Sequence, residues 1–423
     1  MNASIWIMTA GFAALVVLGV PFVFAIGLTV VAVLWVADII PMLLPQTMLT
    51  GTQSFSLLGI PFFMLAGELM SAGGLSRRLI AVADVFVRHL LGGLGHVTVV
   101  AACIFASISG SAPATTAAIG SAMIPAMGER GYSRAYATSL AVSAGVMAPL
   151  IPPSIAFIIW GVIAEQSIAK LFLAGVIPGL CMAIGLSTIV IWRAHRDKIP
   201  QMKRATGAEV RQALRKGIWA LLAPVIVLGG IYGGIFTPTE AAAVACLYSF
   251  IVGVFIEKEL KLSAIPEVIV RAMKVSAIVM GIVAVSGGLG VLVAQEQLAT
   301  RLAAFLAASI HDQWIMLMIL NLGFFLLAAV MDEIALMLIF GPMLIAIGNQ
   351  FGIDPIHFGA MIVTNVAIGM ASPPIGYCLF VGTAISGESL LSVARQIWPQ
   401  IMMMLVVLIL VTYVPAFSLA LVG

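Results

Sequence analysis

Long stretches without a charged residue recur along the whole chain, and this pattern constrains the fold more than any other feature. The stretches span residues 1–37, 39–67, 89–128, 135–164, 171–192, 217–239, 275–295, 355–387 and 396–423. Each can supply the roughly 20 apolar residues of a helix that crosses a bilayer, or two halves of one. Only 9% of the 423 residues are charged and 62% are hydrophobic, whereas about 25% are charged in soluble domains. The sequence therefore predicts an all-α polytopic membrane protein within a lipid bilayer and excludes a soluble globular protein.

The basic residues gather in one short loop, and this sets the predicted topology. Eight of the 20 Lys and Arg residues lie between positions 193 and 216, against two acids, Asp197 and Glu209. Short loops rich in Lys and Arg stay in the cytoplasm. Counting in both directions from this loop gives about ten transmembrane helices, with the N-terminus on the outer side. Because lipid topology explains the basic residues, the net charge of +3 indicates no nucleic-acid partner.

Two apolar stretches fit neither a full span nor a soluble loop. Residues 95–127 and 314–348 return to the side on which they start in this topology. Polar residues interrupt them midway, at 109–113 and at the pair Asp332 and Glu333. Each half has about 14 residues, or roughly 21 Å of helix, too short for a hydrocarbon core of about 30 Å. Both stretches are predicted to be re-entrant helical hairpins.

The two halves of the chain repeat a pattern of glycine and proline at an offset of 221 residues. The pairs are Gly120 with Gly341, Gly131 with Gly352, Pro152 and Pro153 with Pro373 and Pro374, Gly161 with Gly382, and Pro178 with Pro399. Internal repeats of this kind are common in transporters. Five spans plus a hairpin make an odd number of crossings, so the second copy must be inverted. We expect a first repeat over 1–192, a basic cytoplasmic linker over 193–217 and a second, inverted repeat over 218–423.

A double proline interrupts one long apolar segment in each half, at 152–153 and at 373–374. Proline removes a backbone donor and breaks a helix. The freed carbonyl groups are tolerated at membrane depth only beside protein or a polar cavity. A kinked helix without a ligand would also explain a single intramembrane proline. Two double prolines at equivalent positions, each following a hairpin, favour a binding site at the breaks.

Hydroxyl groups and small residues gather at the first hairpin turn and at both breaks. They are Ser107, Ser109, Gly110, Ser111, Thr115, Thr116, Ser143, Ser154, Thr364, Asn365, Gly369, Ser372 and Gly376. Hydroxyl and carbonyl oxygens can replace the water shell of a hard cation such as sodium. Helix N-termini at the hairpin tips would present free amides to an anion. Close helix packing without a ligand also explains such residues in membranes, so both interpretations stay open on this evidence.

Asp332 and Glu333 are adjacent acids within a charge-free run, at the predicted tip of the second hairpin. An ionisable residue at membrane depth is a functional candidate, because placing it there costs roughly 2.5–3.5 kcal/mol. We favour a position of Asp332 near a cation or a gating contact. The alternative is a tip that reaches water, where both acids are solvated.

The sequence contains no recognisable machinery for hydrolysis. Its 5 histidines include no His-Glu-x-x-His pair, and no phosphate-binding motif of the P-loop type is present. We therefore expect a transport protein without catalytic residues or an organic cofactor, rather than an intramembrane enzyme.

In combination, these motifs resemble a known family. Inverted halves with a hairpin and a proline-broken helix are similar to the elevator-type anion carriers of the ion-transporter superfamily. The local sequence resembles the large, DctM-like membrane subunit of tripartite ATP-independent periplasmic (TRAP) transporters. The segments that carry this resemblance are 54–67 with Ile60, Pro61, Phe62 and Phe63, then 109–111, 151–154, 237–242, 352–359 and 373–376. Ser372 departs from the family, which favours Thr before the double proline, but the hydroxyl is kept.

The resemblance implies sodium-driven import of an organic acid, such as a C4-dicarboxylate, a sialic acid or another sugar acid. It places the chain in a bacterial inner membrane with the N-terminus in the periplasm. It also implies two partners, a periplasmic substrate-binding protein and a small four-span membrane subunit. In such an elevator, the hairpins and broken helices move as a transport domain. Segments 4–36, 218–256 and the arms 73–90 and 296–312 would form the scaffold.

By the same resemblance, the sodium sites map onto Ser109, Ser111, Ala148, Pro152, Asp332, Thr364, Asn365, Gly369 and Ser372. The substrate is expected to contact Ser109, Gly110, Ser111, Pro153, Ser154 and Gly376. The alternative function is a self-sufficient sodium-coupled anion symporter of the wider superfamily. A channel is a weaker alternative, because two inverted hairpins suit alternating access.

Overall fold

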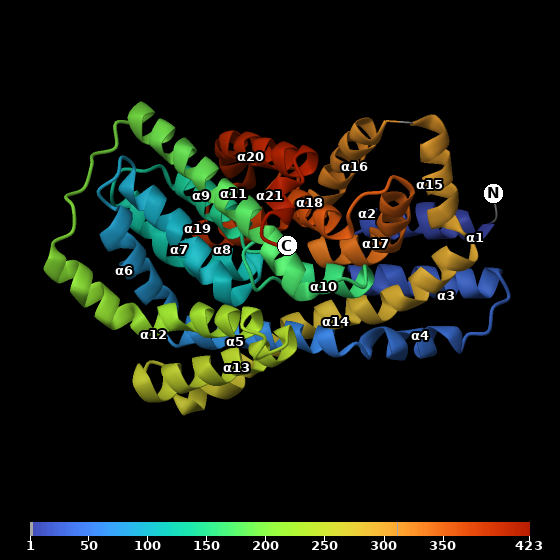
Figure 1. The fold of residues 1–423 in the computed structure, drawn as a ribbon, viewed down its shortest axis with the longest axis horizontal. Coiled ribbons are helices and arrows are strands. Elements are labelled where there is room, and N and C mark those ends of the chain that lie inside the picture. Colours follow the sequence, from blue (N-terminus) through green and yellow to red (C-terminus); the bar gives the residue numbers. More distant parts are fainter. Residues whose placement is uncertain (1–2, 311) are drawn as a thin grey trace.

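The computed structural model describes residues 3–310 and 312–423, and every regular element within these ranges is a helix (Figure 1). This confirms the predicted all-α polytopic membrane protein. Residues 1 and 2, at the start of the predicted first repeat, lie outside the described residues. So does residue 311, within the predicted arm 296–312.

The first helices form the N-terminal part of the fold. They are α1 (Ala3–Trp6), a π turn (Ile7–Gly11), α2 (Phe12–Val17), α3 (Phe22–Val36), α4 (Leu43–Thr52), a 3-10 turn (Phe55–Leu58), α5 (Gly59–Ala72) and α6 (Leu75–Val87). The sequence analysis did not anticipate α4 as a separate helix. Its ten residues include Pro45 and Gly51, both unfavourable in helices, so the local pattern gave no helical signal.

The first predicted hairpin is a pair of helices, α7 (Gly93–Ser109) and α8 (Ala112–Gly128). Each has 17 residues instead of the expected 14, which is about 25 Å and still shorter than a hydrocarbon core. The broken segment that follows consists of α9 (Arg134–Gly145) and α10 (Ile155–Ile163), separated at the double proline. Helix α11 (Ile168–Arg196) completes this half.

The remaining helices form the second half of the chain. It comprises α12 (Gly207–Tyr232), α13 (Pro238–Ile251) with a π turn (Val252–Ile256), a 3-10 turn (Leu262–Ala264), α14 (Ile265–Gln295), α15 (Leu298–Ser309), α16 (Gln313–Ala328), α17 (Glu333–Gln350), α18 (Pro355–Gly369), α19 (Tyr377–Ser386), α20 (Leu390–Tyr413) and α21 (Ala416–Leu419). Helices α16 and α17 form the second predicted hairpin, and the second break separates α18 from α19.

Within the described ranges, seven helices are long and apolar enough to cross a membrane. They are Phe55–Ala72, Ile168–Arg196, Gly207–Tyr232, Pro238–Ile256, Leu262–Gln295, Glu333–Gln350 and Leu390–Tyr413. One of them, Glu333–Gln350, is a half of the predicted second hairpin. The broken segments contribute shorter apolar helices, because each break divides one membrane crossing in two. The count of ten crossings stays a prediction.

The helices pack in two groups. In the first, α14 runs beside α3, α4 and α5, while α13 packs on α5 and α12 (Figure 1, lower layer). In the second, the hairpins and broken helices pack against one another and against α11 and α20. Helix α6 lies between the groups, in contact with both α12 and α7. The hairpins thus belong to one packed unit and helices α5 and α14 to another, and the two units also touch where α17 meets α14 and where α7 meets α5.

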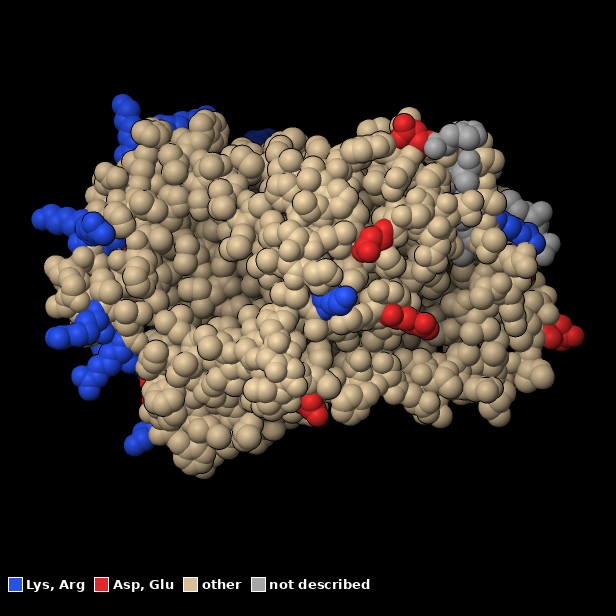
Figure 2. Space-filling model, in the orientation of Figure 1, with Lys and Arg blue, Asp and Glu red and all other residues tan. Residues whose placement is uncertain are grey.

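Basic side chains gather at one end of the molecule (Figure 2), the end at which the connection between α11 and α12 runs (Figure 1). The predicted linker 193–217 is helical over much of its length, because α11 extends to Arg196 and α12 begins at Gly207. A capping box fixes that start: the Thr206 hydroxyl accepts from the Glu209 amide, and the Glu209 carboxylate accepts from the Thr206 amide.

Candidate functional site

The tip of the first hairpin is a tight turn pressed against the first helix break. Helix α7 ends at Ser109, Gly110 adopts a φ of +58°, and Ser111 precedes α8. A Cβ on Gly110 would lie 2.5 Å from the carbonyl oxygen of Pro153. The amide of Ile155 donates to the carbonyl oxygen of Gly110 at 3.3 Å. Glycine is therefore needed here both for its backbone conformation and for the close approach of the break.

The second hairpin tip meets the second break through the same type of contact. The amide of Gly376 donates to the carbonyl oxygen of Ala329 at 2.9 Å. A Cβ on Gly369, the last residue of α18, would lie 2.2 Å from the Cβ of Ala328. The structure thus brings together the tip and the break in each half, as the sequence analysis expected.

The tip contacts and a second set of glycine contacts relate the two halves. The donors Ile155 and Gly376 are 221 residues apart, the offset of the glycine and proline pattern. An ideal Cβ on Gly120 of α8 would lie 3.7 Å from the Ile385 side chain on α19. An ideal Cβ on its counterpart, Gly341 of α17, would lie 2.9 Å from the Ile163 side chain on α10. The tip of each hairpin therefore contacts the helix break of its own half. The second helix of each hairpin contacts the helix that follows the break in the other half.

The predicted site residues of the first half lie deep in the protein. Ser109 is buried, and its Oγ lies 2.8 Å from the Oγ1 of Thr115. Ala148, in the turn that follows α9, is fully buried, and Pro152 and Pro153 are buried. The Ser154 hydroxyl accepts from the amide of Phe157 and so caps α10. The starts of α8 and α10 meet at this point, because Gly110 and Ile155 are hydrogen bonded.

The predicted site residues of the second half use their hydroxyl donors locally. Thr364 Oγ1 donates to the carbonyl oxygen of Ala360 at 2.6 Å, and Ser372 Oγ donates to that of Ile368 at 2.8 Å. Both oxygens keep acceptor capacity, since a hydroxyl has two lone pairs. Both residues are fully buried. These oxygens can face a cation without losing the hydrogen bonds that they already donate.

The two acids at the second hairpin tip have different surroundings. Asp332 Oδ1 accepts from the amides of Ile334 and Ala335 at 3.0 and 3.4 Å, so this residue caps α17. Glu333 is 5% exposed, and its Oε2 has no hydrogen-bond partner among the described residues. The alternative of a solvated tip therefore does not describe Glu333. The role of Asp332 at a cation stays a prediction, and its visible role is that of a helix cap.

Sequence reasoning missed a chain of side-chain amides that holds the second hairpin to the second broken helix. Asn365 Nδ2 donates to both the backbone and the side-chain oxygen of Asn321, each at 2.8 Å. Asn321 Nδ2 in turn donates to Thr412 Oγ1 on α20 at 2.8 Å. The sequence did mark Asn321 as a polar residue of interest. Apart from the first residue, Gln313, it is the one side-chain amide in the apolar helix α16.

Several buried polar atoms near the two hairpins lack a partner within the described parts of the chain. They are Ser143 Oγ, Glu333 Oε2 and Asn365 Oδ1. Cys378, at the start of α19, interacts with the Thr116 side chain of the first hairpin and lies near Asp332 and Glu333, so the first hairpin and the second tip approach each other there. Buried polar groups without partners cost free energy, and a bound ion or anion could satisfy them.

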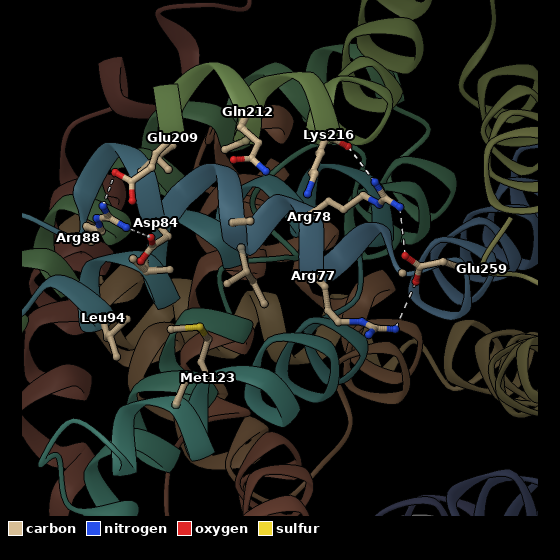
Figure 3. Close-up of a pocket in the computed structure, with 17 residues that line it drawn as sticks. Arg77, Arg78, Asp84, Arg88, Leu94, Met123, Glu209, Gln212, Lys216 and Glu259 are labelled. Atoms are coloured by element: carbon tan, nitrogen blue, oxygen red, sulfur yellow. Dashed lines mark hydrogen bonds and ion pairs between the residues drawn. The ribbon is translucent and has the colours of Figure 1, made fainter. Parts of the chain in front are cut away.

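A separate cavity of about 790 Å³ lies between α6, α12 and the first hairpin (Figure 3). The hairpin contributes apolar residues such as Leu94 and Met123 to the lining. Ion pairs lie toward the two ends of the cavity. Arg78 pairs with Glu259 at 3.1 Å and Arg88 with Glu209 at 2.9 Å. These pairs join the first half of the chain to the second. None of the predicted site residues lines this cavity.

Comparison with known proteins agrees with this architecture. The family model of the DctM component of the tripartite ATP-independent periplasmic transporter matches residues 9–417. The chain is 39% identical over 370 residues to the C4-dicarboxylate TRAP transporter large permease protein DctM of Pseudomonas aeruginosa, covering 88% of this chain and 87% of that protein. It is 37% identical over 401 residues to the 2,3-diketo-L-gulonate TRAP transporter large permease protein YiaN of Escherichia coli, covering 95% and 94%.

A third relative is a longer protein. The isethionate TRAP transporter permease protein DctMQ of Oleidesulfovibrio alaskensis is 38% identical over 414 residues. The match covers 96% of this chain but 64% of that relative, which therefore carries further sequence. All three relatives are named as permeases. The expected resemblance is confirmed, and the chain belongs to the DctM family, the large permease subunits of TRAP transporters.

Proposed function

We propose that this permease subunit imports an organic acid together with sodium, and that both bind where the hairpin tips meet the helix breaks. The observation that carries the proposal is the repeated bond from Ile155 to Gly110 and from Gly376 to Ala329. It joins a non-helical backbone segment to a hairpin tip in each half. Irregular backbone at membrane depth is typical of ion and substrate sites in secondary transporters.

The chemistry of these residues suits a sodium ion. Ser109, Ser111, Thr364 and Ser372 offer hydroxyl oxygens, and the turns that contain Ala148, Pro152 and Gly369 offer carbonyl oxygens. Hard cations prefer such oxygen ligands. Asn365 adds a buried amide oxygen that has no partner in the described structure. Asp332 would add a negative charge at the second tip.

The chemistry of the tips also suits an anionic cargo. The N-termini of α8 and α10 meet at Gly110 and Ser154, and free amides at helix N-termini attract anions. Ser109, Ser111, Pro153 and Gly376 line the same junctions. The names of relatives support a small organic acid, such as a C4-dicarboxylate, a sialic acid or another sugar acid.

We further propose the assembly and movement that the family implies. A periplasmic binding protein would deliver the cargo, and a small four-span subunit would complete the scaffold in a bacterial inner membrane, with the N-terminus in the periplasm. The longer DctMQ relative carries sequence beyond the part that matches this chain, which is compatible with a second subunit in the same system. The packed unit of hairpins and broken helices would move as an elevator against the unit built on α5 and α14.

Reconstitution tests this function directly. Proteoliposomes with the permease, a small subunit and a binding protein are expected to accumulate a radiolabelled organic acid when a sodium gradient is imposed, but not with a potassium gradient. Uptake by the permease alone would instead support the self-sufficient symporter. Flux that neither saturates nor follows the sodium gradient would contradict both and indicate a channel.

Substitutions at the second tip separate a helix cap from an ion ligand. Asp332→Asn keeps a capping side chain but removes the charge, whereas Asp332→Ala removes both, at a cost of about 1 kcal/mol. If Asp332 faces sodium, Asn should weaken sodium activation of uptake by about tenfold. Ser111→Ala, which removes a predicted ligand and no observed cap bond, should also weaken it. Sodium activation equal to wild type in all three variants would remove these residues from the site.

A further inference from the structure

A small cavity of about 260 Å³ lies at the base of the first hairpin. Three segments form it: the start of α7, the loop between α8 and α9, and the linker at residues 199–203. Arg130 and Lys203 are cationic, and none of the lining residues is acidic. Within the described structure, neither cation forms an ion pair with a carboxylate. The lining therefore carries two uncompensated positive charges.

The start of α7 adds backbone donors to this cavity. Gly92 precedes the helix with a φ of +80° and provides no side-chain cap, and the amides of Gly95 and His96 share its carbonyl oxygen. The next residues, Gly93 and Leu94, line the cavity, and no side chain caps their amides. With 17 residues, α7 has a developed positive end at this point.

Tyr132 is an independent indication of an anion site. Its side chain lines the cavity and is 6% exposed, and its buried hydroxyl has no hydrogen-bond acceptor among the described residues. The backbone amide of Gly95, in the first turn of α7, approaches the hydroxyl oxygen as a donor, so it is the hydroxyl hydrogen that lacks a partner. The ring is fixed by stacking on Tyr136, with centroids 6.1 Å apart. A buried hydroxyl hydrogen without an acceptor is unfavourable, and a bound acceptor would remove this penalty.

We propose that this cavity binds a phosphate-type oxyanion. Arg130 and Lys203 would supply charge, the first amides of α7 and the Tyr132 hydroxyl would donate from other directions, and the unesterified oxygens of the phosphate can accept them. The phosphate can come from an anionic lipid headgroup or from free inorganic phosphate. Because Lys203 belongs to the linker and the other donors to the hairpin base, the occupied site ties the linker between the two halves to the first hairpin.

Binding to the full-length purified chain tests this site without any transport assay. Inorganic phosphate is titrated in detergent by microscale thermophoresis, and thermal stability is compared in nanodiscs of phosphatidylcholine with and without phosphatidylglycerol. The double variant Arg130→Gln/Lys203→Gln should lower the affinity by more than about tenfold, and Tyr132→Phe by about threefold to tenfold. The matched control is Arg204→Gln, because Arg204 adjoins Lys203 but does not line the cavity. It should stay within about twofold of wild type.

The two titrations distinguish the sources of the phosphate. Binding of inorganic phosphate in detergent supports a free ion as the occupant, and a response to phosphatidylglycerol alone supports a lipid headgroup. The proposal is overturned if folded wild-type protein responds to neither probe, or if Arg204→Gln loses as much affinity as the double variant. Tighter binding of succinate than of phosphate would also overturn it, since it would indicate a site for cargo. None of these readouts depends on sodium-driven uptake.

Discussion

Gly110→Ala is expected to lower the rate of sodium-driven uptake by about tenfold or more. The residue has a φ of +58°, where an L side chain costs roughly 1–2 kcal/mol. Its new Cβ would also lie 2.5 Å from the Pro153 carbonyl oxygen, so the hairpin tip must move away from the break. That movement would weaken the bond from Ile155 and misplace the helix N-termini of the proposed site. Initial uptake rates in proteoliposomes, normalised to inserted protein, measure the effect.

The chain offers a matched control for this substitution. Gly131 also has a positive φ, +88°, but nothing lies within 4 Å of an ideal Cβ there. Gly131→Ala therefore carries the same kind of backbone cost without the collision, and should keep uptake within about twofold. Equal losses in both variants would assign the effect to backbone strain. Unchanged uptake in Gly110→Ala would show that the contact between tip and break is dispensable.

Arg78→Ala is expected to cost about 2–3 kcal/mol of unfolding free energy, the largest effect on stability among these predictions. The guanidinium pairs with Glu257 and with Glu259, and also donates to the carbonyl oxygen of Lys216 (Figure 3 shows Arg78, Glu259 and Lys216). The Glu257 side chain is only 9% exposed. Removing Arg78 therefore leaves a largely buried carboxylate without its cation. Unfolding by titration with SDS in mixed micelles measures the loss.

The adjacent arginine is the control. Arg77 is 78% exposed and pairs only with Glu259, at 3.3 Å, in the described structure. Arg77→Ala should cost less than about 1 kcal/mol, as is usual for an exposed pair. The double variant Arg78→Ala/Glu257→Ala should lose less than the sum of its single variants, because the second substitution removes the stranded charge. Additive losses would contradict the proposed pairing energy.

The sequence predicted the elements whose signals are local. The expected hairpins 95–127 and 314–348 correspond to Gly93–Gly128 and Gln313–Gln350, since polar interruptions in apolar stretches mark the tips. Both breaks lie at the double prolines, because proline removes a backbone donor from the helix that contains it and so interrupts that helix. Helix α4 was missed because its composition is unfavourable for a helix, whereas its packing against α14 supports it in the fold.

The parts of the candidate site that depend on contacts between distant segments could not be predicted. Asn321 stands out as a side-chain amide in an apolar helix, but the sequence does not indicate its partner, because Asn365 lies 44 residues away. Likewise, the sequence shows two adjacent acids at 332–333 and does not distinguish them. In the fold, Asp332 caps α17 and Glu333 is buried. The burial and the hydrogen-bond partners of these side chains depend on how the two halves of the chain pack together. The residue pattern of one segment does not predict that packing.

The exchange of contacts between halves has a consequence for how the protein is made. Gly120 meets Ile385, and Trp160 Nε1 donates to the carbonyl oxygen of Pro355, 195 residues further along. At a synthesis rate of about 5–20 residues per second, such partners emerge on the order of tens of seconds apart. During that interval α8 and the Trp160 indole lack these partners. A chain truncated before α18 is therefore expected to be degraded by membrane proteases faster than the full chain, which pulse-chase labelling measures.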